Sequence, residues 1–142
     1  MFSREESKQI RQEFWTSFGK LYPQKWLLYN TKIKDVTLKF TFTTKKAQVS
    51  IDIEPNDEVF RTYYYEKIVS LRKILTSEYL KDIIYNPEYQ LENGKIIPRV
   101  YVELSDVSIH NKKNWDEVMK FLSVNMIQLE TFFLEYKDFI QD

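Results

Sequence analysis

The segment 35–54, DVTLKFTFTTKKAQVSIDIE, constrains the fold more than any other part of this chain. Apolar residues alternate with polar residues on both sides of a break at 43–46, which is the period of a β-strand with one buried face. The two runs therefore predict an antiparallel hairpin with strands near 35–43 and 46–54. In the expected register, the apolar pairs are Phe42 with Ala47, Phe40 with Val49 and Leu38 with Ile51.

A second hairpin is predicted around the turn 92–95, ENGK, because Asn-Gly between two extended runs favours a two-residue turn. Strands near 84–91 and 96–104 pair outward from this turn, with Tyr89 opposite Pro98. Each of these runs contains a proline, which cannot donate a hydrogen bond to a neighbouring strand. At least one of the two strands is therefore expected at an edge of the sheet.

Three helices are predicted from apolar residues that recur at steps of three and four. Capping boxes are expected to start the first helix at Ser3 with Glu6 and the last helix at Asn114 with Glu117. The three helices are placed near 3–20, 57–75 and 115–139. The order α-ββ-α-ββ-α predicts an α+β fold, in which about four antiparallel strands in two hairpins are covered by three helices.

The chain of 142 residues has the length of one ordinary domain, so a single globular α+β domain is expected over 1–142. The sequence contains no cysteine and only two glycines, which excludes disulfides, thiolate metal sites, cysteine nucleophiles and glycine-rich phosphate loops. The first residues do not resemble a signal peptide, and no apolar run reaches the roughly 18 residues of a membrane span. The expectation is a cytoplasmic protein without membrane contact.

The formal net charge is zero, but basic and acidic residues are unevenly distributed. Residues 1–75 hold 14 Lys and Arg against 9 Asp and Glu, whereas residues 76–142 hold 7 against 12. A basic half that is interleaved with aromatic residues can bind phosphates and stack on bases. The alternative is that the two halves attract each other within the fold. The candidate nucleic-acid-binding residues are Lys25, Lys32, Lys34 and Lys45.

Few residues of the sequence are candidates for catalysis or metal binding. The single histidine, His110, lies in a polar loop and is interpreted as a solvated or loop-bracing residue. Asp52 and Glu54 point the same way from one strand, as in metal-dependent nucleases, but neither is followed two residues later by the lysine of that pattern. A solvated pair at the strand edge is therefore preferred over a degenerate nuclease that uses them with Lys39. With no nucleophile–base pair or metal cluster in view, no catalytic residue, metal or cofactor is predicted, which favours a protein that is not an enzyme.

Four segments carry a resemblance to a known family: SREESKQIRQEFWTSFGK, WLLYNTKIKD, LENGKIIPRVYVEL and SIHNKKNWDEVMKFLSVNMIQLETFFLEYKDFI. They resemble a bacterial domain family of unknown function, found free-standing or C-terminal to restriction-nuclease-like domains. The resemblance covers nearly the whole chain and supplies no catalytic or binding residues. By association, it implies an interaction with DNA or with defence systems.

The function expected from these observations is a non-catalytic accessory module that binds an unknown protein partner. Two alternatives stay open. One is a nucleic-acid-binding accessory domain linked to restriction or defence systems, and the other is a degenerate metal-dependent nuclease-like domain.

The last predicted helix raises a question of assembly. Its length of roughly 37 Å equals the diameter expected for the whole domain. Its apolar C-terminal end therefore needs a cover, which is either the first helix or a second copy of the chain in a homodimer. The candidate interface residues are Phe132, Phe133, Tyr136, Phe139 and Ile140.

Overall fold

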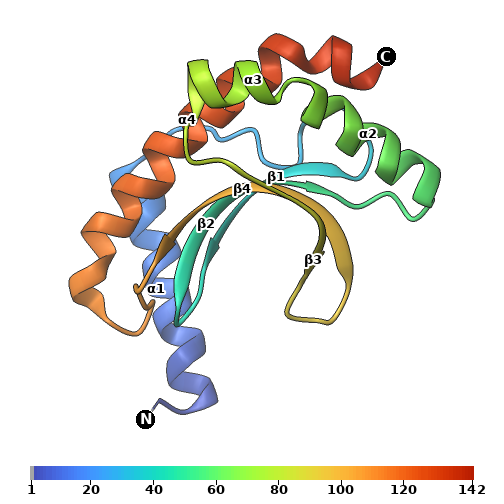
Figure 1. Ribbon diagram of the computed structural model, residues 1–142. Helices are drawn as coiled ribbons and strands as arrows, with labels where there is room; N and C mark the ends of the chain where they lie inside the picture. The colour runs from blue at the N-terminus through green and yellow to red at the C-terminus, as the bar shows by residue number, and fades with distance from the viewer. Residues whose placement is uncertain (1) are drawn as a thin grey trace.

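A computed structural model describes residues 2–142 as a four-stranded antiparallel sheet with helices along one face (Figure 1). The strand order is β1-β2-β4-β3, so β1 and β3 are the edge strands. The predicted α+β class and the two hairpins are confirmed. The elements are α1 (Arg4–Leu21), β1 (Val36–Phe42), β2 (Lys46–Ile53), α2 (Glu58–Ser70), α3 (Arg72–Ile74), the π-helical turn η1 (Leu75–Tyr79), β3 (Ile84–Gln90), β4 (Ile96–Ser105), the 3-10 turn η2 (Lys112–Asn114) and α4 (Trp115–Gln141).

The first hairpin has the predicted register at all three apolar pairs. Its apolar face packs under the helices, because alternate residues of a strand point to the same side of the sheet. Phe40 is only half-buried, since β1 is an edge strand and no strand covers its outer side. Its ring lies 5.2 Å from that of Phe18 and 5.4 Å from that of Trp26.

The register of the second hairpin differs from the prediction. Tyr89 pairs with Ile97 rather than with Pro98, and a β-bulge between Asn86 and Tyr89 shifts the pairing further. Pro87 lies inside this bulge, where the chain has no ladder hydrogen bond to lose. The prediction that a proline-containing strand lies at a sheet edge is confirmed for β3.

The turn of this hairpin explains part of the shift. The N–H of Leu91 donates to the carbonyl of Lys95 at 2.8 Å, and the N–H of Gly94 donates to the carbonyl of Leu91 at 2.9 Å. Gly94 has a φ of 88°, whereas Asn93 does not adopt a positive φ. The connection is therefore a three-residue loop with a left-handed glycine, not the predicted two-residue turn, which needs positive φ at both central residues.

The capping predictions have different outcomes at the two long helices. At α1, Ser3 and Glu6 cap each other's backbone N–H groups at 3.1 Å, as predicted. At α4, Asn114 makes no capping bond, and its side-chain oxygen instead accepts a hydrogen bond from the backbone N–H of Ser108 at 2.9 Å. The chain enters α4 through η2, where the side chain of Asn111 accepts from the N–H of Lys113.

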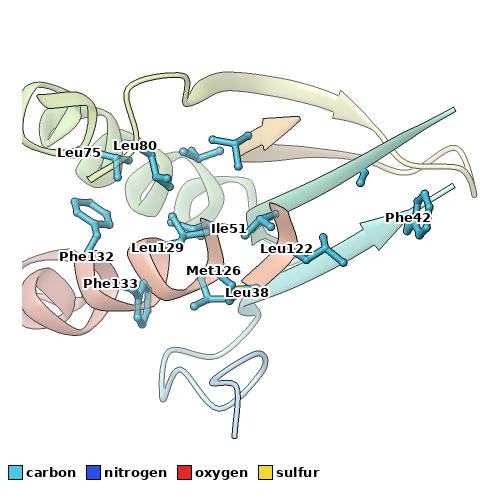
Figure 2. Packing of buried hydrophobic residues seen from close by; sticks show 14 of the residues in the cluster. Leu38, Phe42, Ile51, Leu75, Leu80, Leu122, Met126, Leu129, Phe132 and Phe133 are labelled. Carbon is cyan, nitrogen blue, oxygen red and sulfur yellow. The ribbon is translucent and has the colours of Figure 1, made fainter. Parts of the chain in front are cut away.

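Residues 2–142 form four α-helices rather than the predicted three, and the middle helix is shorter than predicted. It begins with Asp57 as its cap, but α2 ends at Ser70, and the chain continues through α3 and η1. In η1, the N–H of Leu80 donates to the carbonyl of Leu75, five residues earlier. These breaks bend the chain over the second half of α4, where Leu75 and Leu80 are buried (Figures 1 and 2).

This bent segment covers the apolar end of α4. Phe132, Phe133 and Ile140 have no exposed surface, and the ring of Tyr79 from η1 lies 5.5 Å from that of Phe132. These three residues therefore belong to the core of the chain itself and are not a free interface. Tyr136 is half-buried, and Phe139 is 44% exposed. A homodimer through this end stays a prediction that rests on Phe139.

The core joins the helix side of the sheet to α4 and α1 in one cluster of buried residues. Figure 2 shows Leu122, Met126 and Leu129 of α4 beside Leu38 and Ile51 of the first hairpin. Within residues 2–142, no helix combines the length and the apolar character that crossing a bilayer requires.

Phe14 of α1 tests this core. It is fully buried, and its ring lies 4.8 Å from that of Phe42 and 5.2 Å from that of Trp115. We expect Phe14→Ala to lower the free energy of unfolding in urea by about 3–5 kcal/mol, as for other large-to-small core changes. The control is Phe60→Ala, a change at a 53% exposed residue, which should cost less than about 1 kcal/mol. Equal losses in the two variants would contradict this packing.

Candidate binding site

The sheet is concave on the side without helices (Figure 1). This concave face carries a buried ion pair. Asp52 of β2 has no exposed surface, and Arg99 of β4 is 2% exposed. Nε and Nη2 of Arg99 donate to the two carboxylate oxygens of Asp52, each at 2.8 Å. The hydroxyl of Ser50 also donates to Asp52, at 2.8 Å. Such a bidentate pair is strong and fixes the orientation of both side chains.

Gln48 extends this pair into a network. Its carbonyl oxygen accepts from Nη1 of Arg99 at 2.7 Å, and its amide nitrogen donates to Glu103 at 2.7 Å and to the hydroxyl of Tyr89 at 3.1 Å. The ring of Tyr89 also lies 4.4 Å from the guanidinium carbon of Arg99. Burial raises the pKa of the neighbouring Tyr101. The network therefore links β3 to β2 across β4 and stabilises the curved shape of the second hairpin.

The interpretation of Asp52 and Glu54 as a solvated pair is wrong. Asp52 is buried and occupied by Arg99, and Glu54 forms an ion pair with Lys95 at 3.7 Å. Lys39, the third member of the nuclease hypothesis, is an exposed residue of β1. In the part of the chain that the structure describes, no three His, Cys, Asp or Glu residues are grouped closely enough to hold a metal ion. Because Asp52 and Glu54 are both paired with cationic side chains, the geometry does not support the nuclease hypothesis.

A cleft of about 940 Å³ opens beside this network, between the first hairpin, the start of α1 and the tip of the second hairpin. Its lining includes the rings of Trp15, Phe40 and Tyr89. A single carboxylate, that of Glu92, lines it, so positive charge predominates. The basic residues of the lining are Arg11, Lys39, Lys45, Lys46 and Arg99.

Three of these cations have no counter-charge. Arg99 is paired with Asp52, and Lys46 lies 3.8 Å from Glu103. By contrast, no carboxylate of residues 2–142 lies within 4.0 Å of the charged nitrogens of Arg11, Lys39 or Lys45, all of which are exposed. We name these three residues the cleft cations. Their charge is available to an anionic ligand.

The lysines proposed from the sequence are not all part of this cleft. Lys45 lines it, whereas Lys25, Lys32 and Lys34 lie exposed on the connection 22–35, which precedes β1, and do not line it. Two cleft cations were missed. Arg11 lies on the polar face of a helix far away in the sequence, and Lys39 is not among the four candidate nucleic-acid-binding lysines.

A second hollow, of about 420 Å³, follows the outer edge of β1. We name it the edge groove. It is mainly apolar and shares Trp15, Lys39 and Phe40 with the cleft, so the two hollows form one continuous surface. The residues that line the edge groove are Trp15, Leu28, Tyr29, Thr37, Leu38, Lys39 and Phe40.

The connection 22–35 forms one wall of the edge groove, and buried hydrogen bonds hold it in place. The hydroxyl of Thr31 donates to the carbonyl of Val36 at 2.6 Å, and the N–H of Leu27 donates to the carboxylate of Glu130 on α4. Leu28 adopts a φ of 47°, which is unusual for its residue type. Because this backbone is strained, the anchoring bonds are needed to keep the wall in position.

His110 lies in the wall of the cleft. Its Nε2 is 3.1 Å from the hydroxyl of Ser7, and its ring is 4.4 Å from that of Phe2. These contacts agree with a loop-bracing role, because they join the start of α1 to the loop before α4. They also form a nucleophile–base pair that the sequence analysis did not foresee. No carboxylate within residues 2–142 orients the imidazole, however, so the pair lacks the third group of a catalytic triad.

A family model matches residues 10–137 of the chain, and the family is described as Domain of unknown function (DUF4268). The matched range contains all three cleft cations and both hairpins. The resemblance to a domain family of unknown function is thereby confirmed. No curated protein and no solved structure shows significant similarity to the chain. The function has to be argued from the residues themselves.

Removal of one partner tests the buried ion pair. We expect Asp52→Ala to lower the free energy of unfolding by about 3–5 kcal/mol, because Arg99 stays buried without its counter-charge. The double variant Asp52→Leu with Arg99→Met removes both charges and should recover most of this loss. Urea unfolding measures both. If the double variant is as unstable as the single variant, the uncompensated charge is not the source of the loss.

The carboxylate of Glu130, which accepts the hydrogen bond from Leu27, predicts that the stability of the chain depends on pH. Burial raises the pKa of Glu130 above its ordinary value of 4.5, although the bond from Leu27 lowers it. From pH 4.5 upward, the folded chain keeps a proton that the unfolded chain releases, so the contribution of Glu130 to stability falls as the pH rises. Glu130→Gln should therefore be more stable than the wild type at pH 7, and the difference should disappear below pH 4.5. The control is Glu135→Gln at an exposed position of α4, which should show no such divergence in urea unfolding.

Proposed function

Since the chain belongs to the DUF4268 family of domains of unknown function, we propose its role from its geometry: it is a non-catalytic accessory domain that binds a partner protein at the cleft and the edge groove. The observation that carries this proposal is the meeting of three unpaired cations with an apolar groove on one surface. A partner that fits this surface has acidic and apolar side chains.

The non-catalytic part of the proposal is supported by what the polar residues already bind. Both oxygens of Asp52 accept from Arg99, and Glu54 is paired with Lys95. The hydroxyl of Ser7 contacts an imidazole that no carboxylate of the described chain orients. General acid–base and metal-assisted reactions both need a group that is free to accept a proton or hold a metal.

The apolar part of the surface favours a protein over a nucleic acid. Phosphate contacts supply most of the affinity of nucleic-acid binding and need cations along the whole contact. The edge groove provides one cation, Lys39, among the apolar side chains of Trp15, Leu28, Leu38 and Phe40. Such a groove contributes to binding mainly by burying apolar side chains of the ligand.

A nucleic acid is the second candidate, and a specific observation favours it. Tyr29 is 83% exposed at the end of the edge groove, where its ring is free to stack on a base. Around it, Lys25, Lys32 and Lys34 are exposed on the connection 22–35, and Lys45 lies at the tip of the first hairpin. This arrangement supports contact with a single strand through phosphates and bases.

Removal of the cleft cations tests the proposal and separates the two candidates. The variant Arg11→Gln, Lys39→Gln, Lys45→Gln loses three charges at the cleft. Its control, Lys73→Gln, Lys81→Gln, Lys120→Gln, loses the same net charge at exposed positions that do not line the cleft. Fluorescence anisotropy is measured with two labelled probes of equal charge, a peptide that alternates acidic and apolar residues and a single-stranded oligothymidine.

We expect the peptide to bind, and the cleft variant to weaken this binding at least about tenfold more than the control variant does. Oligothymidine binding that depends on the cleft cations, and that weakens steeply between about 50 and 200 mM salt, would favour the second candidate instead. If neither probe binds, or if both variants weaken binding equally, the cleft is not the binding site.

A further inference from the structure

We infer that the partner docks as an extended strand along the open edge of β1, and that its residues alternate between apolar side chains in the edge groove and acidic side chains toward the cleft cations. This inference rests on the proposed function and specifies the conformation and chemistry of the ligand. It depends on three observations: the free backbone groups of β1, the different protection of the two sheet edges, and the distribution of charge across the two faces of β1.

The hydrogen bonds of β1 show which of its backbone groups face outward. The N–H of Thr43 donates to the carbonyl of Lys46 in β2, so the odd-numbered residues of this strand pair with β2. The even-numbered residues point away from β2. The N–H of Leu38 confirms this, because it donates to the carbonyl of Leu28, in the connection 22–35, at 2.9 Å.

The outer edge of β1 is therefore covered in its first half and open in its second half. The carbonyl of Val36 accepts from the hydroxyl of Thr31. The N–H of Val36 donates to the carbonyl of Ile33, and the N–H of Leu38 donates to that of Leu28. Within residues 2–142, nothing pairs with the carbonyl of Leu38 or with the N–H and carbonyl groups of Phe40 and Phe42. These groups span about 13 Å of strand, which is enough for a short added strand.

The opposite edge of the sheet is protected against such pairing. β3 contains Pro87, which has no N–H, and a bulge between Asn86 and Tyr89 interrupts its ladder. Proline and bulges are the usual features that prevent edge-to-edge association. The open half of β1 has neither a proline nor a bulge, and Lys39 is its only charged residue. The sheet therefore leaves one edge available.

The two faces of β1 specify the side chains of the added strand. On the helix side, Phe40 lies beside Trp15 and Leu28 in the edge groove, so the residues that point to this side are apolar. On the concave side, Lys39 lies next to the cleft with Arg11 and Lys45, so the residues that point there are acidic. Because side chains alternate along a strand, the ligand repeats an acidic and an apolar residue.

A second copy of the chain fits this edge less well. Its β1, VTLKFTF, brings a further Lys39 and no carboxylate, so the cleft cations would stay without counter-charge. A partner with acidic residues neutralises them. Charge complementarity of this kind determines which partner binds and how fast it associates.

The test uses the full chain and labelled peptides of about nine residues that alternate Asp or Glu with Val or Phe. One control peptide has the same composition with its acidic and apolar residues in two separate blocks. Two further peptides carry N-methyl groups on alternate residues, one on the acidic positions and one on the apolar positions. Because alternate N–H groups of a strand face the same edge, only one of the two methylated peptides loses its bonds to β1.

We expect the alternating peptide to bind at least about tenfold more tightly than the block peptide, and one methylated peptide to lose about tenfold more affinity than the other. Amide hydrogen exchange should slow at Phe40 and Phe42 in the complex, and not in β3. The peptide should bind the monomeric chain in light scattering.

The outcomes separate the inference from the proposed function. If the peptides bind through the cleft cations, but both methylated forms bind equally and exchange at Phe40 and Phe42 is unchanged, strand addition is wrong and the binding function stands. If no acidic peptide binds and only oligothymidine does, the protein-binding function is itself overturned. If the free chain already forms a dimer with slow exchange at Phe40 and Phe42, the second copy is the occupant of this edge.

Discussion

The buried pair of Asp52 and Arg99 is the interaction on which the concave side of the sheet depends. Two charges leave water here, and this is tolerated because each guanidinium nitrogen and both carboxylate oxygens have a hydrogen-bond partner. The guanidinium donates through Nε and both terminal nitrogens to Asp52 and Gln48, and Ser50 adds a further bond to the carboxylate. Without Arg99, the carboxylate of Asp52 would be a buried charge without a counter-charge, which is unfavourable.

This network also determines the shape of the binding surface. It joins Gln48 of β2 to Tyr89 of β3, two strands that are not neighbours in the sheet. The second hairpin therefore curls back toward the first, as Figure 1 shows, and its tip forms the far wall of the cleft. The β-bulge of β3 makes this curl possible because it bends the strand locally. The start of α1 borders the cleft without covering the concave face, so the cleft stays open to a ligand.

Local patterns predicted the parts of the fold that depend on neighbouring residues. The first hairpin, the cap of α1 by Ser3 and the apolar stripe of α4 follow from residues that are close in the sequence. The errors arise where distant segments decide the outcome. Asn114 is predicted as a helix cap but binds Ser108. The cover of the end of α4 is predicted to be the first helix or a second copy, whereas the bent segment of α3 and η1 provides it.

The candidate site was less predictable than the fold. Lys45 was identified, whereas Arg11 joins it only because α1 packs beside the first hairpin. Asp52 was interpreted as solvated, because a polar residue that alternates with apolar ones usually faces water in a two-layer fold. Its burial depends on the pairing of β2 with β4, which places Arg99 opposite to it. A pattern in one strand cannot show which residue of another strand lies beside it.

The sequence by itself therefore determined the class of the fold, the two hairpins and the helix-facing apolar side of the sheet, because period and capping act over a few residues. Only the tertiary structure decided which edge stays open, which cations lack a counter-charge and how the cleft is closed on its far side. These properties depend on pairings between residues as far apart as Gln48 and Tyr89, whose contact follows from the packing of the whole sheet.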